Sequence, residues 1–211
     1  MCQRASTARD TGRLERMTRN AALLIVDVQN DFTEGGALGC EGGAEVAARI
    51  TEHVTQANYA AVVASRDWHD ADGDNGGHFA VDGAPNFVNT WPVHCVAGTA
   101  GAEYHPAVDT AKIDIHVKKG MGEPAYSAFE GETDEGIPLA QELAARGIGH
   151  LDIVGIATEH CVRASALDAI AEGLSVRVVN DLTAAVSDEG RNRALASMAD
   201  AGAVVVGTIG D

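Results

Sequence analysis

Apolar residues gather in short runs along the chain, separated by polar segments that carry glycine and proline. The runs are rich in valine, isoleucine and alanine and contain few polar positions, which is typical of strands buried on both faces of a parallel sheet. Six runs have the length of a strand: 21–28, 59–67, 112–119, 151–157, 175–181 and 202–208. The sequence therefore predicts six strands.

Between these runs, apolar residues recur at intervals of three or four, the period of a helix with one buried face. Four segments show it: 44–57, 137–146, 160–173 and 188–201. Pro138 suits the first turn of the second segment, and Ser187 can cap the fourth. Alternation of strands and helices predicts an α/β fold, a six-stranded mostly parallel sheet with helices on both faces in a Rossmann-like three-layer sandwich.

Two stretches lack such a period. Residues 68–111 are rich in Gly, Asp, His and Pro, and a loop of that length inside a compact domain is usually functional. Residues 1–19 carry five arginines and no apolar stretch, so we expect a disordered extension and not a secretory signal. Residues 20–211 then form one domain whose loop region, 67–111, is a candidate for binding chemistry.

Composition narrows the choice of partner. The chain has 31 acidic and 15 basic residues, a formal net charge of −16, which disfavours binding to nucleic acid or to an anionic membrane. Its four cysteines are scattered and do not resemble a disulfide framework. No apolar run is long enough to span a membrane. We expect a soluble, cytoplasmic protein that acts on a small molecule, as a monomer or small homo-oligomer.

Three reactive side chains stand at predicted strand exits: Asp27, Lys119 and Cys161. Each has a simpler interpretation, as a turn residue, a solvated strand end and an inert buried thiol. Together they are a set for acyl transfer from an amide. A helix start and a nearby cation are expected to lower the pKa of the thiol, a carboxylate can take its proton, and backbone N–H groups can hold an oxyanion.

The loop region carries a second set of candidates. One carboxylate and three imidazoles suit a divalent transition metal such as Zn²⁺, Mn²⁺ or Fe²⁺. They are Asp67, His69, His78 and His94. A polar loop that merely contains histidines is the alternative. Phe32 and Trp91 flank these groups in the sequence and could enclose a flat ring, or could be ordinary core residues.

These residues lie in motifs that resemble the nicotinamidases (pyrazinamidases) of the isochorismatase-like cysteine hydrolase superfamily. The motifs are "IVDVQNDF", "DWH" followed by "HF", "WPVHCVAGT", "KG" followed by "AYSAFEG", and "VGIATEHCVRASALDA". The resemblance runs from about residue 21 to the end and implies a six-stranded parallel sheet flanked by helices.

The resemblance also implies roles. Cys161 would be the nucleophile, Asp27 the general base and Lys119 the cation of a triad, with the register set on Lys119 and not on Lys118. The metal ligands would be Asp67, His69, His78 and His94. Phe32, Trp91, Ile156 and Ala157 would contact the substrate.

The bond between Ile156 and Ala157 is expected to be cis, and the amides of Ala157 and Cys161 to form the oxyanion hole. Two features depart from the family pattern. The interval between His69 and His78 is longer than usual, and Glu159 stands where aspartate is common.

The implied reaction is hydrolysis of nicotinamide to nicotinate and ammonia in NAD salvage, with pyrazinamide as a further substrate. One rival is a cysteine amidohydrolase for a carbamoyl or ureido compound, whose relatives generally lack the histidine loop. A second is a vinyl ether hydrolase of the isochorismatase type, which needs no cysteine. A third is a non-catalytic metal- or nucleotide-binding module, and the sequence has no G-x-G-x-x-G motif to support the nucleotide.

Overall fold

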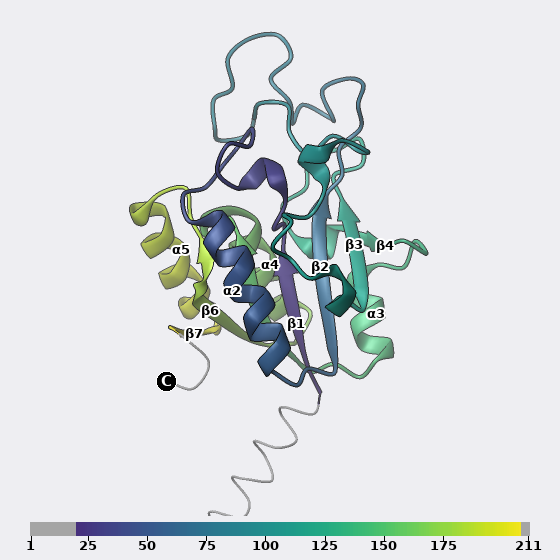
Figure 1. The fold of residues 1–211 in the computed structure, drawn as a ribbon, viewed down its shortest axis with the longest axis vertical. Coiled ribbons are helices and arrows are strands. Elements are labelled where there is room, and N and C mark those ends of the chain that lie inside the picture. The colour runs from purple at the N-terminus through teal and green to yellow at the C-terminus, as the bar shows by residue number, and fades with distance from the viewer. Residues whose placement is uncertain (1–19, 208–211) are drawn as a thin grey trace, which may run out of the picture.

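The computed structural model describes residues 20–207, so the expected disorder of residues 1–19 lies outside the described part. Its centre is a seven-stranded sheet of order β4-β3-β2-β1-β5-β6-β7 (Figure 1). The strands are β1 (Ala21–Val26), β2 (Ala61–Asp67), β3 (Ile115–Lys119), β4 (Glu132–Thr133), β5 (His150–Ile156), β6 (Ser175–Ala184) and β7 (Val204–Val206). Within this sheet only the β3–β4 pair is antiparallel.

All six predicted strands are present with shifted ends, and β4 is an addition that the sequence analysis missed. With two residues, β4 is too short to leave an apolar pattern, and its antiparallel pairing with β3 depends on a turn of the chain. β1 ends two residues early because Asp27 has a positive φ of 49°. β3 begins late because a 3₁₀ turn, Thr110–Lys112, precedes it.

The helices are α2 (Gly43–Gln56), α3 (Leu139–Ala145), α4 (Arg163–Ala171) and α5 (Asp188–Asp200). Three of the four predicted helices match within one or two residues at each end. The fourth, predicted over 160–173, is divided: a π-helical turn, Thr158–Val162, comes first, and α4 follows it. Short 3₁₀ turns occupy Asn30–Phe32, Ala100–Ala102 and Ala128–Glu130.

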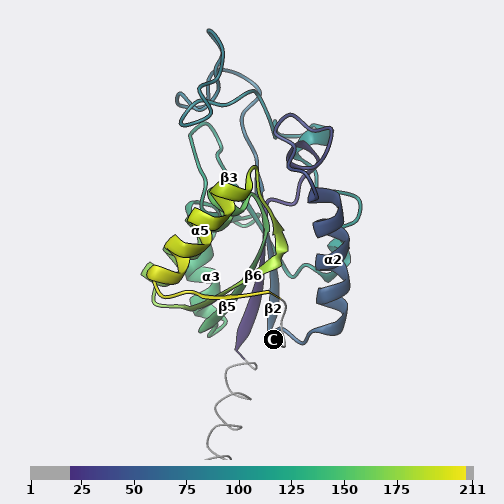
Figure 2. The same cartoon turned by 90° about the vertical axis from the view of Figure 1, so that its left-hand side faces the viewer.

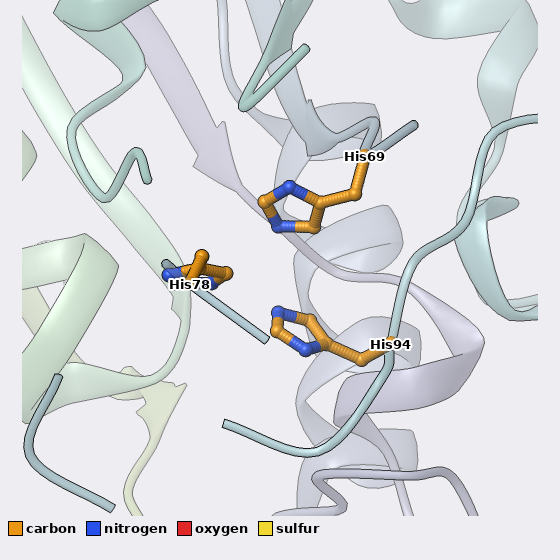
Figure 3. A group of neighbouring side chains, drawn as sticks. All are labelled: His69, His78 and His94. Atoms are coloured by element: carbon orange, nitrogen blue, oxygen red, sulfur yellow. The ribbon is translucent and has the colours of Figure 1, made fainter. Parts of the chain in front are cut away.

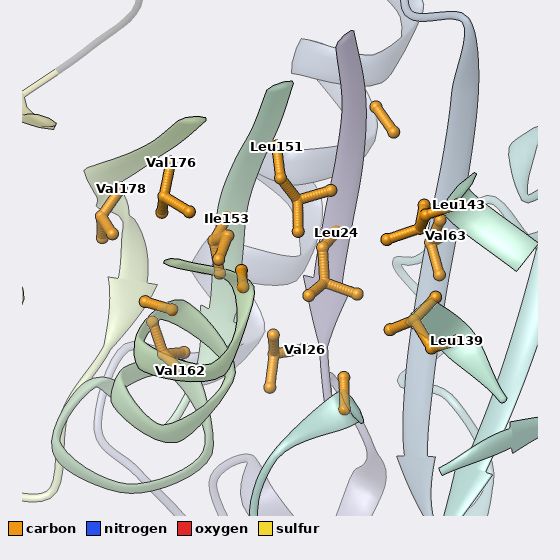
Figure 4. Close-up of a cluster of buried hydrophobic side chains, with 14 of the residues drawn as sticks. Leu24, Val26, Val63, Leu139, Leu143, Leu151, Ile153, Val162, Val176 and Val178 are labelled. Atoms are coloured by element: carbon orange, nitrogen blue, oxygen red, sulfur yellow. The ribbon is translucent and has the colours of Figure 1, made fainter. Parts of the chain in front are cut away.

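Helices cover both faces of the sheet, as expected. Figure 2 shows α2 on one side of the sheet and α3 and α5 on the other. Leu24 and Val26 of β1 point into the core beneath α3, α4 and α5 (Figure 4). Their neighbours Leu23 and Ile25 pack in the second core, with residues of α2. This alternation buries β1 on both faces, and the hydrophobic effect of the two cores stabilises the three-layer arrangement.

The order of the strands decides where a ligand can bind. β1 lies between β2 and β5, so the chain moves outward through β2 and β3 and then returns to the other side of β1. In open α/β sheets, the crevice at such a switch point lies beyond the carboxyl ends of the strands. The first part of residues 68–111 forms the loops above that edge in Figure 1, and the last part returns beside α2 to the start of β3. No helix within 20–207 has the length and apolar character to cross a membrane.

Candidate active site

Asp27 follows directly after β1 and is fully buried. The Ser65 hydroxyl on β2 donates a hydrogen bond of 2.7 Å to Asp27 Oδ1. Lys119 Nζ lies 2.9 Å from the other carboxylate oxygen. The carboxylate is therefore held on both oxygens at the carboxyl edge of the sheet.

Lys119 is the last residue of β3, and its side chain is fully buried. Side chains alternate along a strand, so Lys118 points to the opposite face, where it pairs with Asp134 at 2.8 Å. Register places Lys119 beside Asp67 of β2, and the two side chains form a short ion pair. Lys119 Nζ also lies 3.8 Å from Cys161 Sγ. The expected register on Lys119 thus agrees with its burial and contacts.

Cys161 lies in the π-helical turn that follows β5. The Val162 N–H donates to the Ala157 carbonyl at 3.2 Å, and the bond between Ile156 and Ala157 is cis, as expected. The Thr158 hydroxyl donates to the Ala184 carbonyl at 3.0 Å, which ties the turn to β6. One oxygen or sulfur from each of Asp27, Asp67 and Cys161 lies within 4.8 Å of the others.

The pKa shifts correct one expectation. Burial raises the pKa of the Cys161 thiol well above its ordinary value, and this effect exceeds the lowering by Lys119. Burial also raises the pKa of Asp27 against the opposing charge of Lys119. For Lys119, burial favours the neutral form, but Asp27, Asp67 and Cys161 together raise its pKa well above the ordinary value. The resting site therefore holds a neutral thiol beside a charged ammonium group.

Three histidines from separate loop segments converge next to these groups (Figure 3). His69, His78 and His94 are buried, and one ring nitrogen of each lies within 4.8 Å of the others. His69 Nδ1 lies 2.7 Å from the Gly120 carbonyl, and His94 Nδ1 lies 2.7 Å from the Pro92 carbonyl. A carbonyl only accepts, so Nδ1 carries the proton in both rings and Nε2 keeps a free lone pair.

This arrangement fits a metal ion. His69 Nε2 and His78 Nδ1 are buried without a hydrogen-bond partner in the described part of the chain, which is costly unless another ligand satisfies them. Carbonyl partners on the far nitrogen are also the usual support of a metal-binding imidazole. Despite the longer interval, His78 does meet the other two rings.

Asp67 lies between the histidines and the lysine. Its Oδ2 is 3.8 Å from His69 Nε2 and 3.7 Å from His94 Nε2, while Oδ1 pairs with Lys119. Burial would raise the pKa of Asp67, but Lys119 and the two histidines lower it well below the ordinary value. The predicted ligand thus lies beside two of the three rings and also contacts the predicted triad.

A cavity of about 410 Å³ opens beside these groups. Cys161, Asp67, His78 and His94 line it, together with Phe32, Trp91 and Ala157. Ile156, predicted as a substrate contact, does not line the cavity and packs in the core shared with α2. The cavity therefore joins the Cys161 thiol, His78, His94 and the two aromatic rings on one surface.

Several residues of this region were not singled out from the sequence. Tyr126 lines the cavity, and its hydroxyl accepts a hydrogen bond of 2.8 Å from Trp91 Nε1. His160 lines it as well, with its ring 5.1 Å from that of Trp91 and nearly perpendicular to it. Phe87 completes the wall. Tyr126 lies within the quoted "AYSAFEG" motif, but no spacing rule pointed to the role of its side chain in the cavity wall.

Comparisons with known proteins identify the family to which this fold belongs. Residues 21–209 match the isochorismatase domain family. A nicotinamidase/pyrazinamidase of Mycobacterium tuberculosis is 47% identical over 88% of this chain and 97% of its own length. The structure of PnC1 from L. infantum in complex with nicotinate aligns with a TM-score of 0.77 and 35% identity, covering 90% of this chain and 93% of that chain.

A pyrazinamidase of Pyrococcus horikoshii, whose structure is a complex with zinc, aligns with a TM-score of 0.74 and 35% identity, covering 89% of this chain and 98% of that chain. Neither the family match nor these alignments depends on one motif, because each extends over most of the chain. The chain therefore belongs to the isochorismatase domain family and, within it, falls among the nicotinamidases and pyrazinamidases.

Proposed function

We propose that this protein is a cysteine amidohydrolase that converts nicotinamide to nicotinate and ammonia in NAD salvage and also hydrolyses pyrazinamide. The observation that carries the proposal is the meeting of Cys161, Asp27 and Lys119 with three buried histidines beside one cavity. The M. tuberculosis relative, named for both activities, supports both substrates.

In the first half-reaction, Cys161 Sγ attacks the carboxamide carbon while Asp27 takes the thiol proton. A raised pKa makes the Asp27 carboxylate a stronger base than an exposed one. Lys119 Nζ, 3.8 Å from the sulfur, stabilises the negative charge that develops there. The thiol is neutral at rest, so Asp27 must take its proton for the sulfur to attack.

The tetrahedral oxyanion accepts hydrogen bonds from the amides of Ala157 and Cys161. Both lie where strand β5 passes into a helical turn, and the first N–H groups of a helix lack partners within it. Asp27 then returns the proton to the departing nitrogen, and ammonia leaves. A water molecule hydrolyses the thioester, with Asp27 again as the base, and nicotinate is released.

Phe32 and Trp91 hold the pyridine ring in the cavity. A divalent transition metal held by Asp67, His69, His78 and His94 would bind the ring nitrogen and so orient the carboxamide toward the sulfur. Zn²⁺, Mn²⁺ and Fe²⁺ all suit this donor set. We also place the reaction in the cytoplasm, because Cys161 must remain a free thiol and reducing compartments keep it so.

The same histidines argue against the rival substrates. A carbamoyl or ureido compound offers no ring nitrogen, so the lone pairs of His69 Nε2 and His78 Nδ1 would have no function in binding it. Vinyl ether hydrolysis would give Cys161 no role. The sheet-edge triad likewise has no role in a binding module.

The test is ammonia release from nicotinamide by the metal-loaded protein. We expect Cys161→Ala to lower kcat by about three orders of magnitude or more, because a nucleophile is lost. Cys95→Ala is the control, since Cys95 is buried outside the cavity. Chelation should also abolish activity, and adding the metal back should restore it.

Two results would contradict the proposal. Ammonia release that persists in Cys161→Ala would exclude the thioester route. A metal-loaded wild type that releases ammonia only from carbamoyl or ureido compounds would exclude nicotinamide as the substrate.

A further inference from the structure

Phe87 combines three features that ordinary surface residues do not share. Its side chain is 58% exposed although it is large and apolar. Its φ is 56°, in the left-handed region that a bulky side chain disfavours. It also lines the same cavity as Cys161 and Trp91. An exposed apolar side chain held in strained backbone is a reason to look for function.

The strain at Phe87 follows from a tightly bonded loop tip. The Asn86 carboxamide oxygen accepts from the N–H groups of Val88 at 2.9 Å, Asn89 at 3.0 Å and Thr90 at 3.1 Å. The Phe87 N–H donates to the Thr90 carbonyl at 3.1 Å. Glycine would meet the backbone requirement at this position without strain. The hydrogen bonds of the loop do not require a phenyl side chain at this position, so its presence indicates a contact outside the loop.

The contact outside the loop is with Trp91, which lines the same cavity as Phe87. Its centroid lies 6.2 Å from that of Trp91, with the planes at 84°, an edge-to-face contact. The Trp91 N–H donates to the His78 carbonyl at 2.9 Å, and the Ala80 N–H donates to the Trp91 carbonyl at 2.9 Å. These bonds tie the base of the loop to the histidine segment. Phe87 thus stands at the outer end of an aromatic wall that continues through Trp91 to Tyr126.

We propose that Phe87 is a substrate-binding and specificity-determining residue that covers the solvent side of the bound ring. The inference rests on the proposed function and adds a limit that this side chain sets on the size of ring substituents. Phe87 is exposed and lines the cavity beside Trp91, so a flat ring held at Trp91 would have an edge between the phenyl group and the cavity interior. The phenyl group shields that edge from water and leaves no room for a large substituent.

The test compares Phe87→Gly with Val88→Gly in the metal-loaded full-length protein. Val88 is the neighbouring residue, 77% exposed, and does not line the cavity. We expect Phe87→Gly to raise KM for nicotinamide by about three- to tenfold with kcat changed by less than about twofold, the size of one lost aromatic contact. It should also improve the relative kcat/KM for nicotinamides that carry a large ring substituent. Val88→Gly should change neither the KM for nicotinamide nor the relative kcat/KM for the substituted nicotinamides.

Two further measurements separate binding from folding. Phe87→Gly should keep or raise the Tm, because glycine relieves the left-handed strain. Phe87→Tyr, which keeps the ring, should restore KM to within about twofold of the wild type. An unchanged KM and unchanged preference in Phe87→Gly would overturn the proposal. A lower Tm together with a lower kcat and unchanged KM would also overturn it, because the ring would then be structural.

A binding assay distinguishes failure of this proposal from failure of the proposed function. Nicotinamide is titrated into Cys161→Ala and into Cys161→Ala/Phe87→Gly, with quenching of tryptophan fluorescence as the signal, since Trp91 is one of two tryptophans. We expect Kd to rise about three- to tenfold in the double variant. If the wild type binds nicotinamide without hydrolysing it, the proposed function is wrong. The ratio of the two Kd values still shows whether Phe87 contributes to binding. Equal Kd values, or no binding by either variant, would overturn the proposal.

Discussion

Gln29 shows how one buried side chain can position a site without touching a substrate. Its carboxamide nitrogen donates to the Asp67 carbonyl at 2.9 Å and to the Ala102 carbonyl at 2.8 Å, and its oxygen accepts from the Asp67 N–H at 2.8 Å. Gln29 is fully buried. Asp67 contacts both Lys119 and the histidines. By fixing the main chain of Asp67, Gln29 also fixes the link between the proposed triad and the proposed metal ligands.

We predict that Gln29→Leu will destabilise the fold and weaken metal retention. The change leaves buried main-chain groups of Asp67 without partners, at a cost of about 1–3 kcal/mol. Denaturant unfolding and metal content after dialysis are the measurements. Gln56→Leu is the matched control, because within residues 20–207 the Gln56 side chain bonds to Glu52 alone, on the exposed surface. Full metal retention in Gln29→Leu would show that Asp67 needs no such support.

At the scale of elements, the turn that carries Cys161 is tied to α5 as well as to β6. The Glu159 carboxylate accepts from the Val186 N–H at 3.1 Å and from the Ser187 N–H at 2.9 Å, just before α5 begins. Gly190 packs so closely that an added Cβ would lie 2.5 Å from Glu159 Oε1. Glu159, which stands where the family usually has aspartate, therefore has close contacts with the start of α5.

Gly190→Ala should accordingly lower kcat several-fold while leaving the fold intact. Alanine favours the helix by up to about 1 kcal/mol, but its methyl group must displace the flexible Glu159 carboxylate and loosen the turn. Steady-state kinetics and the Tm are measured together. Gly149→Ala is the control, because a Cβ there meets nothing within 4 Å. A kcat equal to that of the control would argue against any dependence of Cys161 on this contact.

At the scale of the whole molecule, buried histidines make the metal-free fold sensitive to acid. Burial, followed by the charges of His69 and His94, lowers the pKa of His78 to about 4. Burial also lowers the pKa of His53, His116 and His160. A depressed histidine pKa means that the unfolded chain binds protons first, so stability is complete above about pH 6.5 and is lost as the pH falls toward the folded value.

For the chelated protein, we predict a free energy of unfolding that decreases from pH 7 to pH 4. Because the pKa of His78 falls from its ordinary value of 6.5 to about 4 on folding, His78 contributes to this loss of stability across that range. Denaturant unfolding across this range is the measurement. His78→Gln should flatten the slope. Stability that holds constant down to pH 4 would contradict the prediction.

The sequence by itself determined the element order and the chemical identities at the strand ends. Continuous apolar runs and the helical period are local properties, so β1, β2, α2 and α5 could be placed within a few residues. Parallel strands end at a common edge, and this geometric rule was enough to expect that Asp27, Lys119 and Cys161 meet. Histidine spacing was enough to nominate a metal site.

Only the tertiary structure decided the remaining features. β4 exists through its pairing with β3, and Tyr126 and Phe87 reach the cavity through packing against Trp91. The upward shift of the Cys161 pKa also depends on burial. The sequence showed a helix start and a nearby cation, which lower a thiol pKa, but did not show how deeply the thiol is buried. The physical reason is the same in each case: desolvation and side-chain distances arise from contacts between residues far apart in the chain, and a sequence pattern records only local preference and chemical type.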